Sequence, residues 1–137
     1  MPRVKKIDHI GIVVANMKSA IQKYENLLLQ KPSSTEYFEP RKIDLAFFEV
    51  AGVSVELLAP RDPQSEIGRF LREKGEGMHH ICYQVDDLDR ILKSLREQGF
   101  KLVDEKPRPG SRGSRVAFVD ASSTGGTLTE YCEFPKD

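Results

Sequence analysis

The sequence has little cysteine and lacks long hydrophobic runs. Its 137 residues include two cysteines, Cys82 and Cys132, which are too few for the disulfide framework of a small secreted domain. No apolar stretch is long enough to span a bilayer, and the N-terminus carries no apolar run of signal-peptide length. We therefore expect a cytoplasmic protein that makes no contact with a membrane.

An excess of one charge sign is also absent. Lysine and arginine together number 21, as do aspartate and glutamate, so the formal net charge is +0. A neutral balance gives no electrostatic basis for binding nucleic acid. The segment GSRGSR at 110–115 is rich in glycine, but it precedes a predicted strand, whereas a phosphate-binding loop joins a strand to a helix. We expect neither a nucleic-acid partner nor a nucleotide cofactor.

The same pattern occurs twice in the chain. KIDHIGIVVANMKSAI at 6–21 and GMHHICYQVDDLDRIL at 77–92 each contain a histidine, a short apolar run and an amphipathic helical segment. Asn16 stands where the N-cap of the first helix is expected, and Asp86 and Asp87 supply a cap for the second. A long repeat that occurs twice is typical of a duplicated module rather than of a solenoid.

The apolar periodicities place the elements of each half in the order strand, helix, strand, strand, strand. We predict an α+β fold in which two tandem βαβββ modules, 6–60 and 78–134, are joined by a helical linker at 61–77 within a single domain at 1–137. The proline- and glycine-rich stretch at 106–115 reads as a loop. The strands are predicted at 6–14, 43–50, 53–59, 79–85, 100–104, 116–119 and 127–134, and the helices at 17–28, 65–74 and 88–98.

The repeat places a histidine in the first strand of each module and a glutamate in the last. A lone strand histidine is usually an ordinary core or surface residue, and a lone strand glutamate is usually solvated. Matched repetition changes this expectation, because a carboxylate buried in an apolar strand such as VSVELLA is costly unless it is paired or bound to a metal. Imidazole and carboxylate are ligands of divalent metals. The candidate metal ligands are His9, Glu56, His80 and Glu130.

Neighbouring residues on the strands are assigned to faces by alternation. His79 and His80 must face opposite sides of their strand, and alignment with His9 selects His80 as the ligand. His79 is then expected on the outer face or in a subunit contact. Cys82 and Cys132 each lie two positions after a candidate ligand and should share its face. We expect them to be small buried side chains rather than sulfur ligands.

Together these motifs resemble the vicinal oxygen chelate superfamily, which includes glyoxalase I, extradiol dioxygenases and methylmalonyl-CoA epimerases, and the epimerases are the closest likeness. The resemblance covers nearly the full chain. It implies a half-barrel around a divalent Co, Zn, Ni or Mn ion held by the four candidate ligands, and a homodimer. The segments that carry it are IDHIGIVV, VELLAP, SEIGRFLREKGEG before MHHICYQVDDL, and GSRGSRVAFVD before STGGTLTEY.

The resemblance also implies a reaction. A metal-dependent epimerase of a 2-substituted acyl-CoA such as methylmalonyl-CoA removes the α-proton and returns it to the other face through a metal-stabilised enolate. Glu130 and Asp44 are the candidate acid–base residues. Asp44, in KIDLAFF, matches a position that carries a glutamate base in some epimerases. The alternative, which the sequence leaves equally open, is an exposed strand aspartate.

One segment departs from the epimerase pattern. Asp120, Ala121 and Ser122 stand where many epimerases have His-Pro-Lys, so that lysine is missing from any site for the acidic parts of the substrate. Arg41, Arg112 and Arg115 are candidates to meet a carboxylate or phosphate instead. The alternative for each of them is a solvated loop charge.

Three other functions compete with the epimerase. A glyoxalase I-type lyase acting on a thiol hemithioacetal uses the same four ligand types. An extradiol dioxygenase generally needs two histidines and one glutamate, so a fourth ligand at Glu56 counts against it. A non-enzymatic binding module would keep the cavity of the fold and lack turnover.

Overall fold

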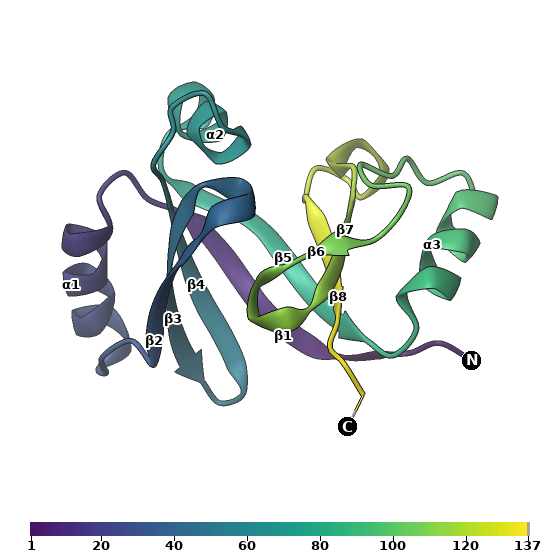
Figure 1. Cartoon of the computed structure of the whole chain (residues 1–137), viewed down its shortest axis with the longest axis horizontal. Helices are drawn as coiled ribbons and strands as arrows, with labels where there is room; N and C mark the ends of the chain where they lie inside the picture. The colour runs from purple at the N-terminus through teal and green to yellow at the C-terminus, as the bar shows by residue number, and fades with distance from the viewer. Residues whose placement is uncertain (137) are drawn as a thin grey trace. The chain divides into compact units, whose positions relative to one another are not determined.

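The computed structural model describes residues 1–136 and has an α+β fold (Figure 1). The chain forms two compact units, of which one comprises residues 9–79 and the other comprises residues 1–8 together with those from 80 onward. Within the described residues, every helix is too short or too polar to cross a membrane. In chain order the elements are β1 (Val4–Val13), α1 (Met17–Leu28), β2 (Ser34–Phe38), the 3-10 helix η1 (Glu39–Arg41), β3 (Ile43–Val50), β4 (Val53–Pro60), α2 (Glu66–Lys74), β5 (Gly77–Val85), α3 (Leu88–Glu97), β6 (Arg108–Pro109), η2 (Ser111–Gly113), β7 (Arg115–Val119), η3 (Ala121–Ser123) and β8 (Thr129–Glu133).

The element order confirms the two predicted βαβββ modules. The series β1, α1, β2, β3, β4 is repeated as β5, α3, β6, β7, β8, with α2 in the connection. Strand order within each series is the same, β2-β3-β4-β1 and β6-β7-β8-β5. In both, the first strand runs parallel to the last and the other neighbours are antiparallel. The assignment of the whole chain to one domain stays a prediction.

Both predicted helix caps form. The Asn16 side chain accepts a hydrogen bond from the backbone N–H of Ser19 at 3.0 Å, and Asp87 accepts one from Arg90 at 3.2 Å. Each cap satisfies a backbone donor that the first turn of a helix leaves without an intrahelical partner. The repeated sequence therefore starts α1 and α3 by the same local device.

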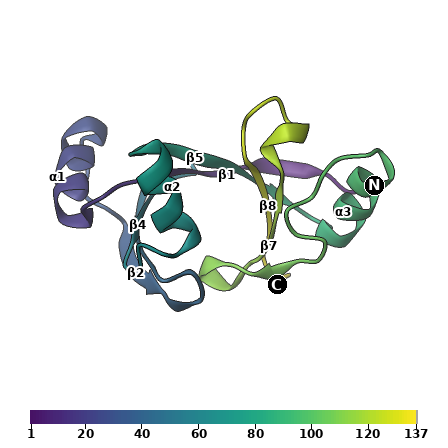
Figure 2. The same ribbon diagram turned by 90° about the horizontal axis from the view of Figure 1, so that it is seen from above.

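Within residues 9–79 the sheet is covered on both faces. One face, called the α1 face, packs Ala46, Phe48 and Leu57 against α1. The other face packs Val13 and Leu45, among others, with residues of α2. Figure 2 shows α1 and α2 on opposite sides of β4. Alternation along each strand separates these two apolar sets.

In the unit that contains residues from 80 onward, α3 covers one face of the sheet (Figure 1). This α3 face buries Leu92 of the helix together with Ala117 and Val119 of β7. The opposite face buries Cys82 and Cys132, which pack with Val116 and Phe134. The unit thus has one face for its helix and one face for the side chains described below.

The structure differs from the sequence-based prediction in three segments. The strand expected at 100–104 is reduced to a single bridge between Leu102 and Val119. Strand β2 was not located from the sequence, because four of its five residues are exposed and show no apolar alternation. Strand β6 lies inside the predicted loop, where Pro109 is tolerated at the edge of the sheet.

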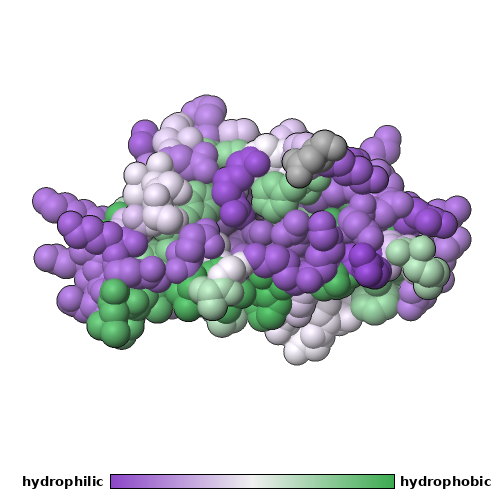
Figure 3. Space-filling model, turned by 90° about the horizontal axis from the view of Figure 1, so that it is seen from below, coloured by the Kyte–Doolittle hydropathy of each residue, from purple (hydrophilic) through white to green (hydrophobic). Residues whose placement is uncertain are grey.

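Hydrophilic side chains predominate on the face of the molecule in Figure 3, and hydrophobic ones gather in places. This agrees with a charged fraction of 31%. Among the exposed apolar residues, Leu27 and Leu29 lie at the end of α1. Single exposed apolar side chains are usual in soluble proteins, so these residues do not indicate a binding surface.

Candidate functional site

His9 and Glu56 form a buried pair within residues 9–79. On the parallel strands β1 and β4, His9 lies beside Ser54 and Gly11 beside Glu56, which puts both side chains on the same face as Val13. Nε2 of His9 lies 3.6 Å from Oε2 of Glu56. Only 4% of His9 and 5% of Glu56 is exposed. We call this side, opposite the α1 face, the His9 face.

His80 and Glu130 repeat the arrangement in the other unit. Nε2 of His80 lies 3.0 Å from Oε1 of Glu130, and both residues are buried. The His80 ring packs edge-on against Phe118 with the ring centroids 5.5 Å apart. Since Phe118 pairs with Glu130 across β7 and β8, all three side chains share the face opposite α3. We call it the His80 face.

The donor sets of both pairs fit a divalent cation. Two atoms that bind one cation at 2.0–2.2 Å lie about 3–3.5 Å from each other, close to the distances within the two pairs. Nitrogen and carboxylate oxygen are suitable ligands for Zn and for other first-row divalent metals. A buried carboxylate is costly without a charged partner. The two pairs therefore have the chemistry, burial and spacing that metal ligands need.

His79 departs from its expected place. Only 8% of the residue is exposed, and its ring lies edge-on to Phe70 of α2 with the centroids 4.8 Å apart. The side that alternation assigns to His79 is therefore covered by α2 rather than open, which alternation alone does not reveal, and the subunit contact stays a prediction.

Cys82 and Cys132 lie on the His80 face, as alternation predicted. Cys82 pairs with Glu130 across the parallel strands β5 and β8, and Cys132 lies two residues further along β8. The pKa of Cys82 is raised far above the usual thiol range, mainly by burial. A hydrogen bond with the Cys132 thiol and the charges of Glu130 and Asp8 raise it further. Cys82 is therefore a neutral thiol at physiological pH.

Asp44 lies on the α1 face. It pairs across the antiparallel strands with Ala59, whereas Glu56 pairs with Phe47 three positions along. The carboxylate of Asp44 receives hydrogen bonds from Arg61, with Oδ1 2.8 Å from the terminal nitrogen Nη2 and Oδ2 3.0 Å from Nε. This register puts Asp44 and Glu56 on opposite faces of the sheet. Asp44 thus has an ion pair on the face opposite Glu56, and its role as an acid–base residue stays a prediction.

The three arginines that the sequence singled out have different surroundings. Arg41 pairs with Glu66 of α2 at 2.7 Å. Arg115 pairs with Asp89 of α3 at 3.1 Å and with Glu133 at 2.9 Å.

Arg112 pairs with a buried residue instead, Asp8, at 2.6 Å. Sequence analysis missed Asp8, although an acidic residue inside the apolar strand of IDHIGIVV is the signal that could have pointed to it. Its partner is 104 positions away in the sequence, beyond the reach of any local pattern.

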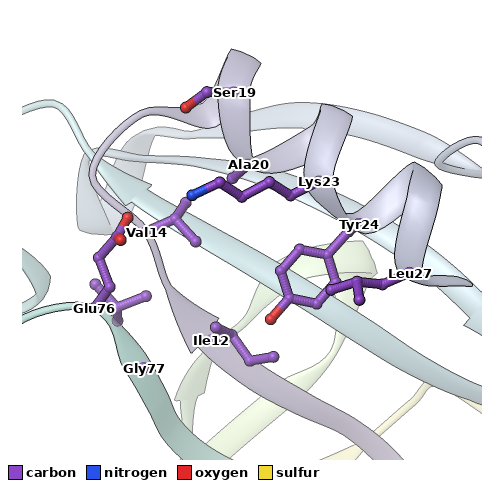
Figure 4. Close-up of a pocket in the computed structure, with 10 residues that line it drawn as sticks. Ile12, Val14, Ser19, Ala20, Lys23, Tyr24, Leu27, Glu76 and Gly77 are labelled. Atoms are coloured by element: carbon purple, nitrogen blue, oxygen red, sulfur yellow. The ribbon is translucent and has the colours of Figure 1, made fainter.

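A cavity of about 280 Å³ lies against α1 (Figure 4). In this view Tyr24 of α1 lies over Ile12, and Lys23 extends toward Val14, on the side where Glu76 lies. Glu76 accepts a hydrogen bond from the backbone N–H of Ala15 at 2.8 Å. Because Ile12 packs with the α1 face, the cavity lies away from the His9–Glu56 pair and is not the candidate site.

Comparison with known proteins identifies similar chains. The uncharacterized protein YqjC of Bacillus subtilis is 38% identical over 130 residues, covering 95% of this chain and 93% of that protein. The structure of a hypothetical protein from Bacillus halodurans is 34% identical with a TM-score of 0.92, covering 96% of both chains.

A structure of methylmalonyl-CoA epimerase from Mycobacterium tuberculosis is also 34% identical, with a TM-score of 0.89, covering 97% of this chain and 90% of that one. Residues 8–118 match the profile of a protein family, and this match spans most of the chain. The chain therefore belongs to the Glyoxalase/Bleomycin resistance protein/Dioxygenase superfamily.

Proposed function

We propose that the protein is a metal-dependent epimerase of a 2-substituted acyl-CoA, with methylmalonyl-CoA as its substrate. The observation that carries the proposal is the buried His–Glu pair that occurs once in each module. The likeness to methylmalonyl-CoA epimerase from Mycobacterium tuberculosis supports the same reaction.

In this proposal His9, Glu56, His80 and Glu130 together bind one divalent cation, which is Co, Zn, Ni or Mn. The support is the matched position of the two pairs in the repeat and the burial of all four residues. A bound cation would stabilise negative charge developing on the thioester oxygen of the substrate. His80 also orients Glu130 through their close approach.

Glu130 acts as the base. It takes the α-proton onto a carboxylate oxygen, and the electron pair of the C–H bond moves into the enolate of the acyl group. A proton that originates from solvent adds to the opposite face of that carbon and restores the thioester with inverted configuration, and Glu130 then releases the α-proton to solvent, so the step involves no oxidation or reduction. Burial of Glu130 keeps water from competing for the proton.

A lyase of the glyoxalase I type remains the second candidate, because its reaction also needs an enolate-like intermediate and the same four ligand types. The homodimer and the cytoplasmic location that the sequence predicts also stay predictions.

Deuterium incorporation tests the proposal. Purified protein loaded with each candidate metal is incubated with methylmalonyl-CoA in D₂O, and mass spectrometry follows the α-position. The epimerase gains one deuterium at that carbon, and the rate falls when the metal is removed with a chelator. Absence of exchange with every metal contradicts the proposal. Thioester formation from methylglyoxal and a thiol would then favour the lyase.

A further inference from the structure

Arg112 lies in the same unit as the His80–Glu130 pair and on the same side of its sheet. Its terminal nitrogen is 2.6 Å from Oδ2 of Asp8. A carboxylate oxygen of Asp8 lies within 4.8 Å of the Cys82 sulfur, and Cys82 is the neighbour of Glu130 across β5 and β8. A continuous series of polar side chains therefore leads from the proposed base to the guanidinium of Arg112.

Arg115, the first residue of β7 after this loop, points the other way. It alternates with Val116 on β7, and Val116 packs with Cys82 on the His80 face. Arg115 consequently faces α3, where it meets Asp89. Of these two arginines, Arg112 is the one that lies on the His80 face.

The loop around Arg112 fixes its position. Arg112 has φ +57° and ψ +30°, a left-handed conformation that is costly for a residue with a Cβ atom. A Cβ at Gly110 would lie 2.5 Å from Val116 Cγ1 and 2.6 Å from Ser114 Oγ, so a larger residue there would require these side chains to shift. The hydroxyl of Ser114 donates to the carbonyl of Ser111 at 2.8 Å. The loop thus holds Arg112, a positively charged residue, in an unfavourable backbone conformation.

Asp8 and Phe134 are among the residues that orient the guanidinium. Asp8 is buried and holds the guanidinium from one side, and the Phe134 ring lies under it at 5.2 Å from the centroid. The Arg112 side chain is still 32% exposed. A guanidinium carries five N–H donors in a planar fork that matches a carboxylate.

We propose that Arg112 binds the free carboxylate of the acyl-CoA substrate and so selects 2-carboxyacyl thioesters over simple acyl thioesters. This inference rests on the proposed function and adds a specificity residue to the same site. A charge-assisted pair of this kind favours the carboxylated ligand by about 10- to 100-fold. If Arg112 only anchored the loop, its loss would lower stability and leave the preference intact.

Binding of two thioesters that differ by one carboxylate tests the inference. Calorimetric titration of the metal-loaded protein with methylmalonyl-CoA and with propionyl-CoA gives the ratio of the two Kd values. We expect Arg112→Met to reduce the preference for methylmalonyl-CoA by about 10- to 100-fold with the Kd of propionyl-CoA unchanged. Arg112→Lys should keep part of the preference, and it carries the test if Arg112→Met does not fold.

Arg115→Met, three residues further along the chain but on the other face, is the matched control and should keep the wild-type ratio. An unchanged ratio in both Arg112 variants overturns the inference. If the wild-type protein nevertheless exchanges the α-proton of methylmalonyl-CoA, the proposed function survives that result. A wild-type protein that exchanges the proton of no acyl-CoA removes the proposed function, and this inference with it.

Discussion

Nε2 of His80 lies 3.0 Å from Oε1 of Glu130, and both side chains are almost completely buried. Parallel pairing of β5 with β8 brings together two residues that are distant in the sequence. The first module contains the same relationship between His9 and Glu56. Each of the two modules therefore contains one buried His–Glu pair.

Replacing Glu130 with glutamine should slow α-proton exchange by about 10²- to 10⁴-fold, because the amide cannot accept the proton. Glutamine keeps an oxygen donor and nearly the same shape, so metal content should change less than the rate does. Exchange into D₂O at equal metal occupancy measures the effect. Glu133→Gln, on the same strand, is the control and should retain the wild-type rate. Equal rates for wild type and Glu130→Gln would show that another group removes the proton.

Asp44→Asn should change the exchange rate by less than about tenfold, below the effect expected for loss of a general base. The reason is that Asp44 lies on the opposite face of its sheet from Glu56 and pairs with Arg61. Steady-state exchange kinetics on the metal-loaded variant measure this. A loss as large as that of Glu130→Gln would instead assign Asp44 the catalytic role that the sequence left open.

Gly68→Ala should destabilise the protein by about 1–3 kcal/mol, because an added Cβ would overpack the start of α2. That atom would lie 2.4 Å from the carbonyl oxygen of Asp62 and 2.7 Å from that of Pro63, and backbone atoms cannot turn away as a side chain can. Urea unfolding gives the free energy of unfolding. Glu73→Ala, an exposed site in the same helix, is the control and should be close to neutral. Equal stability of Gly68→Ala and the wild type would mean that this turn relaxes freely.

Asp86 should make the attachment of the N-terminus dependent on pH. The backbone N–H of Arg3 donates to Asp86 at 2.8 Å and is the main reason why the pKa of this carboxyl is lowered. Because the pKa of Asp86 is lower in the folded state, its hydrogen bond contributes to stability. That contribution is complete above the unfolded-state pKa of about 3.9 and is lost as the pH falls through the folded-state pKa. The protection of the Arg3 amide from hydrogen exchange, measured relative to the intrinsic rate at each pH, should therefore fall below about pH 3.9.

Asp86→Asn should remove this pH dependence, while Asp62→Asn should leave it unchanged. A titration of Asp86 by NMR at the ordinary aspartate pKa would contradict the explanation.

The repeat made much of the fold predictable, because the strands, the caps at Asn16 and Asp87 and the histidine–glutamate spacing are all local or recurring signals. Strand β2 escaped detection since its exposed residues carry no apolar pattern. The burial of His79 depends on Phe70 of α2, and the pairing of Asp8 with Arg112 depends on β7 and its preceding loop. Such contacts arise only from tertiary packing, which sequence spacing does not encode.

The metal content of the purified protein tests the central claim most directly. We expect one divalent ion per chain by elemental mass spectrometry, and a strong loss of that ion in each of four variants, His9→Ala, Glu56→Ala, His80→Ala and Glu130→Ala. Arg115→Met should keep it. Two ions per chain, or full metal content in the variants of either pair, would contradict a single cation shared by all four side chains.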